Sequence, residues 1–82
     1  MNKRKLLERI YNSQTNVKFG DFVTLIEAFG FERIHVNGSH RTYNRSDVPD
    51  LINIQNDKGK AKPYQVKQFL KIVEKHQLKL EP

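Results

Sequence analysis

A run of seven residues near the middle of the chain carries the side chains best suited to chemistry. It reads Asn37-Gly38-Ser39-His40-Arg41-Thr42-Tyr43 and lies between two segments whose residues alternate as in β-strands. The glycine lets the backbone approach a ligand closely, an imidazole can change charge near neutral pH, and a guanidinium matches the geometry of a phosphate. A Gly-Ser turn followed by a histidine is also ordinary hairpin chemistry. The pattern therefore indicates a turn that can meet a ligand, and leaves open whether His40 is catalytic.

A second informative feature is a cluster of lysines in front of the last predicted helix. Lys58, Lys60 and Lys62 precede Pro63, which suits the first position of a helix. The helix dipole is positive there, so stability alone would favour acidic residues. Basic side chains beside the free N–H groups of a helix start form a site that fits a phosphate. The alternative is a lysine-rich loop in contact with solvent.

The charge of the whole chain agrees with an anionic ligand. The 82 residues include 15 Lys and Arg against 9 Asp and Glu, a formal charge of +6. The charge is uneven, because seven lysines and a single acid, Glu74, lie between residues 58 and 79. A small domain this basic is typical of proteins that bind a polyanion, most often nucleic acid. An acidic partner protein is the alternative.

Several classes of function lack support in the sequence. There is no apolar run near the roughly 20 residues that a membrane span needs, and no charged-then-apolar leader at the start. We expect no membrane association and a cytoplasmic location. The chain has no cysteine, and its three histidines lack the close spacing of metal ligands, so we expect neither a metal nor another cofactor.

Two kinds of catalytic site are also disfavoured. There is no glycine-rich loop of the nucleotide-binding type. A Ser39–His40 dyad is unfavourable because neighbouring residues on a strand point to opposite faces. What remains is His40 as a proton-transfer residue, and RNA suits such a residue because its own 2′-hydroxyl is the nucleophile.

The hydrophobic pattern predicts one α+β domain over residues 1–82. We expect a three-stranded antiparallel sheet packed by helices, in the order helix, helix, strand, strand, strand, helix. The first and last predicted helices span residues 3–12 and about 63–77, and the second has an apolar face of Phe22, Leu25, Ile26 and Phe29 and ends at Gly30. The predicted strands span 32–37, 40–45 and 51–55, and residues 56–62 form a loop.

The first predicted hairpin fixes which face His40 occupies. A two-residue loop puts Arg41 and Tyr43 on the face of Ile34 and Val36. His40, Thr42 and Asn44 then share the opposite, open face with His35 and Arg33. A bulge at the glycine would invert this assignment.

At these residues the chain resembles the HicA toxin family of bacterial and archaeal toxin–antitoxin modules. The resemblance rests on Gly38-Ser39-His40 followed by Tyr43, on Lys62-Pro63-Tyr64-Gln65-Val66, and on Phe29-Gly30-Phe31. It covers residues 17–80 as a core, with residues 1–16 as an N-terminal helical extension. One departure is the segment 44–49, which replaces a shorter link of many members.

The resemblance implies a fold like that of the double-stranded-RNA-binding domain and a toxin that cleaves RNA. It implies His40 as the catalytic residue and a HicB-like antitoxin that covers the active surface. The glycine and serine match the turn that positions the histidine, and the lysine cluster maps onto residues that touch phosphates. The candidate RNA-binding residues are therefore Gly38, Ser39, Arg41, Lys58, Lys60 and Lys62.

The leading hypothesis is a metal-independent endoribonuclease that cleaves mRNA as a toxin of a type II toxin–antitoxin system. One positioned general acid or base supplies about 10²–10⁴-fold in rate. A second catalytic group stays open between His35, Arg41 and a lysine. The alternatives are a non-catalytic RNA-binding module of the same fold and a protein-interaction domain whose basic face docks an acidic partner.

Overall fold

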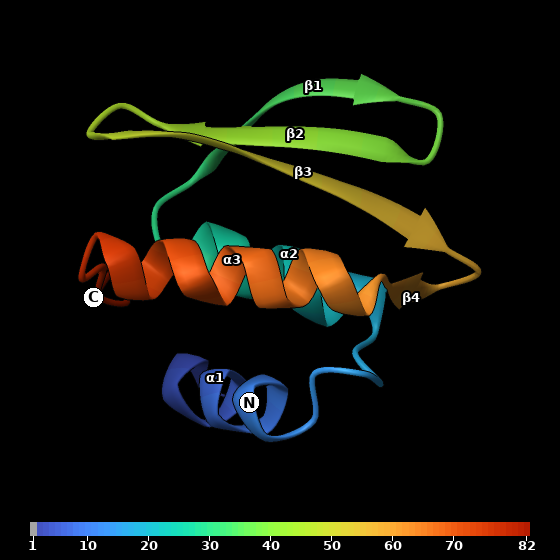
Figure 1. The fold of residues 1–82 in the computed structure, drawn as a ribbon, viewed down its shortest axis with the longest axis horizontal. Helices are drawn as coiled ribbons and strands as arrows, with labels where there is room; N and C mark the ends of the chain where they lie inside the picture. The colour runs from blue at the N-terminus through green and yellow to red at the C-terminus, as the bar shows by residue number, and fades with distance from the viewer. Residues whose placement is uncertain (1) are drawn as a thin grey trace.

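The structure is a computed structural model, and it describes residues 2–82. Three helices and four strands make up the fold (Figure 1). They follow one another as α1 (Lys3–Asn12), α2 (Phe19–Ala28), β1 (Glu32–Asn37), β2 (His40–Arg45), β3 (Val48–Asp57), β4 (Lys60–Ala61) and α3 (Pro63–Lys75). Met1, the first residue of the predicted N-terminal extension, lies outside the described residues.

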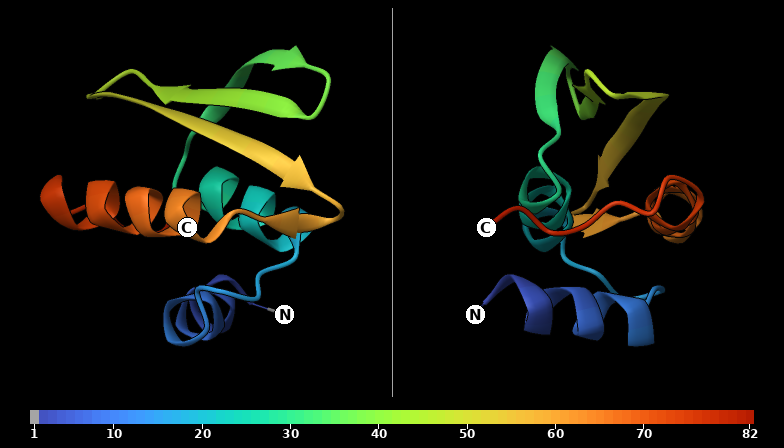
Figure 2. Two further views of the ribbon diagram at one scale, coloured as in Figure 1. Left: turned by 45° about the vertical axis from the view of Figure 1, so that its right-hand side comes forward. Right: turned by 90° about the vertical axis from the view of Figure 1, so that its left-hand side faces the viewer.

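The elements form three layers. Strands β1 to β3 make the first layer, α2 and α3 lie side by side beneath it, and α1 lies on the far side of α2 and α3 (Figures 1 and 2). Within residues 2–82, no helix covers the other face of β1 to β3. We call this uncovered side the open face and the opposite side the helix face. The sheet therefore has one buried side and one side that faces solvent.

Local chemistry explains where the helices begin and end. The side chain of Asn2 accepts a hydrogen bond from the backbone N–H of Lys5 at 2.8 Å, which caps α1. Helix α2 begins at Phe19, whose N–H donates to the carbonyl of Gly59 at 2.9 Å and so does not stay unpaired. Gly30 follows α2 with a φ of 86° and ends it, as predicted. Pro63 opens α3, which ends at Lys75, two residues earlier than predicted.

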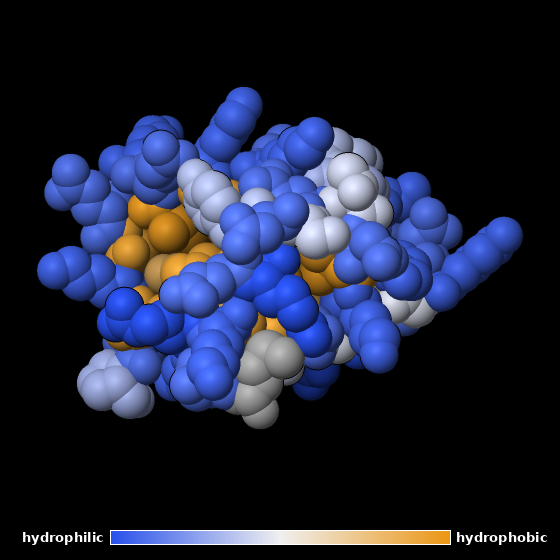
Figure 3. All heavy atoms as spheres, turned by 90° about the horizontal axis from the view of Figure 1, so that it is seen from below, coloured by the Kyte–Doolittle hydropathy of each residue, from blue (hydrophilic) through white to orange (hydrophobic). Residues whose placement is uncertain are grey.

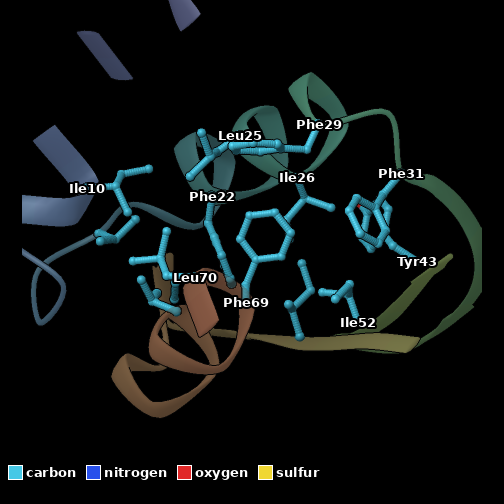
Figure 4. Packing of buried hydrophobic residues seen from close by; sticks show 14 of the residues in the cluster. Ile10, Phe22, Leu25, Ile26, Phe29, Phe31, Tyr43, Ile52, Phe69 and Leu70 are labelled. Atoms are coloured by element: carbon cyan, nitrogen blue, oxygen red, sulfur yellow. The ribbon is translucent and has the colours of Figure 1, made fainter. Parts of the chain in front are cut away.

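The core lies between the sheet and the helices, with Phe69 of α3 near its centre. The Phe69 ring packs edge to face against Phe22, Phe29 and Phe31, at centroid distances of 5.7–5.9 Å (Figure 4). Such pairs stabilise a core beyond the area that they bury. Ile10 of α1 belongs to the same cluster, so the N-terminal helix packs onto the main core.

The sheet has four strands where the sequence predicts three. Its order is β1-β2-β3-β4 and all neighbours are antiparallel. The added strand, β4, lies inside the predicted loop 56–62, since Lys58 and Gly59 both adopt positive φ, 52° and 85°, and form a two-residue hairpin turn. The predicted α+β architecture is confirmed, and it is compatible with a fold like that of the double-stranded-RNA-binding domain.

Strand β3 is longer than the predicted span of 51–55. It begins at Val48 and includes Pro49. The pairing between β2 and β3 is irregular there, because residues 49–51 of β3 lie opposite the single residue Asn44, between the pairs Tyr43–Ile52 and Arg45–Val48. Proline is tolerated at such an irregularity because the regular ladder of hydrogen bonds is interrupted there and does not need its N–H.

Strand β1 departs from the predicted alternation. The register slips by one residue between Arg33 and His35, so Ile34 occupies a bulge. As a result Arg33 pairs with Tyr43. The predicted placement of Arg33 on the same face as His35 is therefore wrong. Ile34 and Val36 are 54% and 48% exposed, because β1 is an edge strand and the helices do not cover it there.

The outer surface is largely hydrophilic. Viewed from the side of α1, polar and charged residues cover most of the molecule and apolar residues show between them (Figure 3). None of the helices within residues 2–82 combines the length and the apolar character that crossing a membrane requires.

Candidate functional site

The turn between β1 and β2 consists of Gly38 and Ser39, the two-residue loop that the sequence predicts. Gly38 has a φ of 62°, and a glycine at the first central position is the pattern of a type II′ hairpin. The N–H of Asn56 donates to the carbonyl of Ser39 at 2.9 Å and ties the turn to the end of β3. The turn is therefore held in place at one end of the sheet.

His40 is the first residue of β2 and lies on the open face. It pairs with Asn37 of β1 and with Gln55 of β3, and it is exposed. Because side chains alternate along a strand, Thr42 shares this face, and its hydroxyl donates to Asn53 Oδ1 at 2.9 Å. The bulge in β1 lies at Ile34 and not at the glycine, so the predicted orientation of His40 holds.

Arg41 lies on the helix face, where it pairs with Val36 and Ile54. Its guanidinium carbon lies 5.2 Å from the centroid of the Phe19 ring, a cation–π contact. This contact holds the Arg41 side chain at the same end of the sheet as the Gly38-Ser39 turn.

A shallow depression of about 310 Å³ lies beside this turn, and we call it the turn depression. It brings together four of the six predicted RNA-binding residues, from the two hairpin turns and from β2. Its lining residues are Phe19, Gly38, Ser39, Arg41, Asn56, Lys58 and Gly59. Arg41 and Lys58 make it cationic, which suits a phosphate group.

Lys58 occupies an unusual position in the turn depression. It is a non-glycine residue with a φ of 52°, in the left-handed region. That conformation costs an L-residue about 1–2 kcal/mol, and asparagine or glycine is the usual choice there. The lysine at this position adds a cationic side chain to the lining of the turn depression.

The other two predicted lysines lie outside the turn depression. Lys60 Nζ donates to Asn16 Oδ1, and Lys60 lines a separate hollow of about 280 Å³ with Arg9 and Lys18. Lys62 is the N-cap residue of α3. The three lysines diverge because the β3–β4 hairpin places Lys58 in its turn and Lys60 on the following strand, where the sequence predicts a single loop.

Gln65 belongs to the run of residues 62–66 that carries the family resemblance, and it has a structural role that the sequence analysis does not assign. Only 8% of Gln65 is exposed, and its Oε1 accepts a hydrogen bond from the backbone N–H of Gln55 at 2.9 Å. Gln55 is the β3 partner of His40, so Gln65 fixes the strand beside the histidine. The sequence signals of this role are the place of Gln65 in that run and in the first turn of an amphipathic helix.

Tyr43 belongs to the core and not to the site. It is fully buried on the helix face, and its hydroxyl has no hydrogen-bond partner within residues 2–82. In the same range, no group of three or more His, Asp or Glu side chains lies close enough together to hold a metal ion.

One comparison with known proteins gives a match. The family model described as the HicA toxin of bacterial toxin-antitoxin matches residues 19–74 of the 82-residue chain. The match runs from the start of α2 to the last turn of α3, and therefore includes both hairpins and the turn depression. No curated protein sequence and no solved structure matches the chain.

Proposed function

We propose an RNA-cleaving activity for this chain, which belongs to the HicA toxin family of bacterial toxin–antitoxin systems. In this proposal the toxin is of type II, its target is mRNA, and its activity needs no metal ion. The reaction uses the 2′-hydroxyl of the RNA as nucleophile and His40 as a proton-transfer residue.

A single observation carries this proposal. His40 begins β2 directly after the Gly38-Ser39 turn, and the turn depression gathers Arg41 and Lys58 at the same end of the sheet. A phosphate bound by those two cations would lie next to the strand that carries the histidine. Backbone N–H groups and cations aimed at a phosphate also stabilise the charge that develops on it during cleavage.

The proposed roles of the binding residues follow from their positions. Gly38 and Ser39 offer a closely approachable backbone, while Arg41 and Lys58 bind a phosphate next to the scissile one. Lys60 and Lys62 lie outside the turn depression and would contact more distant phosphates of the same strand. Each phosphate contact that is lost should lower the slope of log K for single-strand binding against log salt concentration by about 0.7 in magnitude.

The first experiment is a cleavage assay on the purified chain, free of any partner, with a long RNA and excess chelator. We expect fragments that end in a 2′,3′-cyclic phosphate or the 3′-phosphate derived from it. His40→Ala should lower the rate by about 10²–10⁴-fold and leave binding intact, and His76→Ala at the end of α3 is the matched control.

Three outcomes would contradict the proposal. A requirement for a divalent metal ion would remove the metal-independent mechanism. Equal cleavage by His40→Ala and the parent chain would remove His40 from it. Intact RNA with a salt-sensitive gel shift would identify a non-catalytic RNA-binding module.

We further propose a HicB-like antitoxin as the protein partner and the cytoplasm as the place of action. The partner would cover the open face and the turn depression, and the +6 charge of the toxin favours an acidic antitoxin. Adding such an antitoxin should suppress cleavage and displace RNA in the same titration.

We also propose that the chain acts as one domain, with residues 17–80 as the HicA-like core and residues 1–16 as an N-terminal extension. The family match begins at residue 19, and Leu6 and Ile10 of α1 pack into the same hydrophobic cluster as α2 and α3. The extension would then support the core and take no part in cleavage.

A further inference from the structure

We propose that His35 on β1 is the second proton-transfer residue, acting together with His40. The inference rests on the proposed ribonuclease function, because it assigns the half of the proton transfer that His40 does not perform. Cleavage by attack of a 2′-hydroxyl needs one group to accept a proton and another to donate one.

The strand register places the two histidines on the same face. His35 pairs with Thr42, which lies two residues from His40 on β2, and His40 pairs with Asn37, two residues from His35 on β1. His35 and His40 are therefore diagonal neighbours, whose Cα atoms lie about 7–8 Å apart in an antiparallel pair. Both residues are exposed on the open face.

The bulge at Ile34 separates His35 from Arg33. A strict alternation would place both on one face, but the register slip pairs Arg33 with Tyr43 of the helix face. His35 lies on the hairpin side of the bulge, so it stays in register with Thr42 and shares the open face with His40.

The other candidates for the second group lie elsewhere. Arg41 is on the helix face and contacts the Phe19 ring. Lys58 lines the turn depression, and Lys60 is hydrogen-bonded to Asn16. Lys62 is the N-cap residue of α3, which lies on the helix side of the sheet (Figure 1). Among the groups considered from the sequence, His35 is the one that shares a face with His40.

The surroundings of the two histidines suit an RNA strand. Their sheet partners are the neutral residues Asn37, Thr42 and Gln55, so no carboxylate among these partners opposes a phosphate. Asn53 is fixed by its hydrogen bond from the Thr42 hydroxyl at 2.9 Å. The open face thus offers two imidazoles among amide and hydroxyl groups that can bind a ribose or a base edge.

The proposed step balances in atoms and protons. One histidine, neutral, takes the proton of the 2′-hydroxyl, and the 2′-oxygen forms a bond to phosphorus. The bond from phosphorus to the 5′-oxygen breaks, and the other histidine, charged, donates a proton to that oxygen. The products are a 2′,3′-cyclic phosphate and a 5′-hydroxyl, and solvent then restores the two protonation states.

The test measures single-turnover cleavage of one RNA over a range of pH for the parent, His35→Ala and His40→Ala, with His76→Ala as the control. The parent should show a bell-shaped profile. His35→Ala should lose about 10²–10⁴-fold in rate and one limb of the bell, while its RNA binding and melting temperature match those of the parent.

A second substrate identifies the role of each histidine. An RNA with sulfur in place of the bridging 5′-oxygen has a leaving group that needs no proton. We expect this substrate to restore cleavage in one of the two single variants, the one that lacks the acid. If this substrate restores cleavage in neither single variant, the assignment of His35 and His40 as an acid–base pair is overturned.

Failure of this inference can be told apart from failure of the proposed function. If the parent cleaves, His40→Ala does not, and His35→Ala cleaves at the parental rate, only the role of His35 is refuted. A lower rate of His35→Ala with an intact bell would also refute it, since that result indicates a structural role. If His40→Ala cleaves like the parent, the proposed function itself fails.

Discussion

The two faces of the sheet differ in their surroundings, since one packs against the helices and the other is exposed to solvent. On β2, Arg41 and Tyr43 point to the helices, and Tyr43 is fully buried. His40 and Thr42, one residue away, lie on the open face among polar partners. A single strand thus supplies both the core and the candidate site, because alternation separates them by one residue. The core can then be changed with little effect on the site, and the site with little effect on the core.

The largest expected effect comes from breaking the helix face. Phe69→Ala should lower the free energy of unfolding by about 3–5 kcal/mol, since Phe69 contacts three other phenylalanine rings. Leu51→Ala is the matched control, because Leu51 is apolar but 54% exposed. Urea denaturation of both variants checks the comparison, and equal losses would contradict it.

A smaller effect is expected at the link between α3 and β3. Gln65→Ala should lower the free energy of unfolding by about 1–3 kcal/mol, because the N–H of Gln55 loses its acceptor. Gln68→Ala, an exposed change on the same helix, is the control. Thermal melts measure the loss. Hydrogen exchange at the Gln55 amide should also speed up in Gln65→Ala, and unchanged exchange would argue against the link.

Lys58→Asn separates stability from binding at the turn depression. Asparagine adopts the left-handed conformation more readily than lysine, so we expect a gain in stability of up to about 1 kcal/mol. The same change removes a cation. The slope of log K for RNA binding against log salt concentration should therefore fall by about 0.7 in magnitude. Lys67→Gln, on the exposed surface of α3, removes equal charge. Identical binding losses in both variants would show that only net charge matters.

The smallest effect is expected at Tyr43. Its buried hydroxyl has no partner within residues 2–82, so Tyr43→Phe should leave stability unchanged or raise it by up to about 1 kcal/mol. The cleavage rate should stay at the parental value, because Tyr43 lies on the helix face. A large drop in the rate would place this residue in the mechanism.

Much of the fold follows from periodicity in the sequence. The helix at residues 3–12 matches its predicted bounds, and the first hairpin has the predicted two-residue turn. The family resemblance is likewise confirmed by the match over residues 19–74. These features depend on local patterns, such as apolar residues at helical spacing and a glycine at a turn.

The missed features depend on geometry that residue types do not specify. Strand β4 can pair with β3 because Lys58 adopts a positive φ in the turn between them. A lysine in the sequence does not predict that conformation. The bulge at Ile34 depends on how β1 fits β2 along its whole length. The separation of Lys60 from the turn depression follows from β4 in turn. The catalytic role of His40 and the binding roles of its neighbours stay predictions.

The bulge in β1 also affects the tendency of the chain to aggregate through its exposed edge strand. An exposed edge strand with free backbone groups is a template for adding strands from other molecules, the first step towards aggregation. Ile34 and Val36 make β1 apolar enough to invite such stacking. The bulge breaks the regular spacing of its N–H and C=O groups and twists the edge. The same irregularity that moves Arg33 away from the face of His35 therefore helps to keep this edge from adding strands of other molecules.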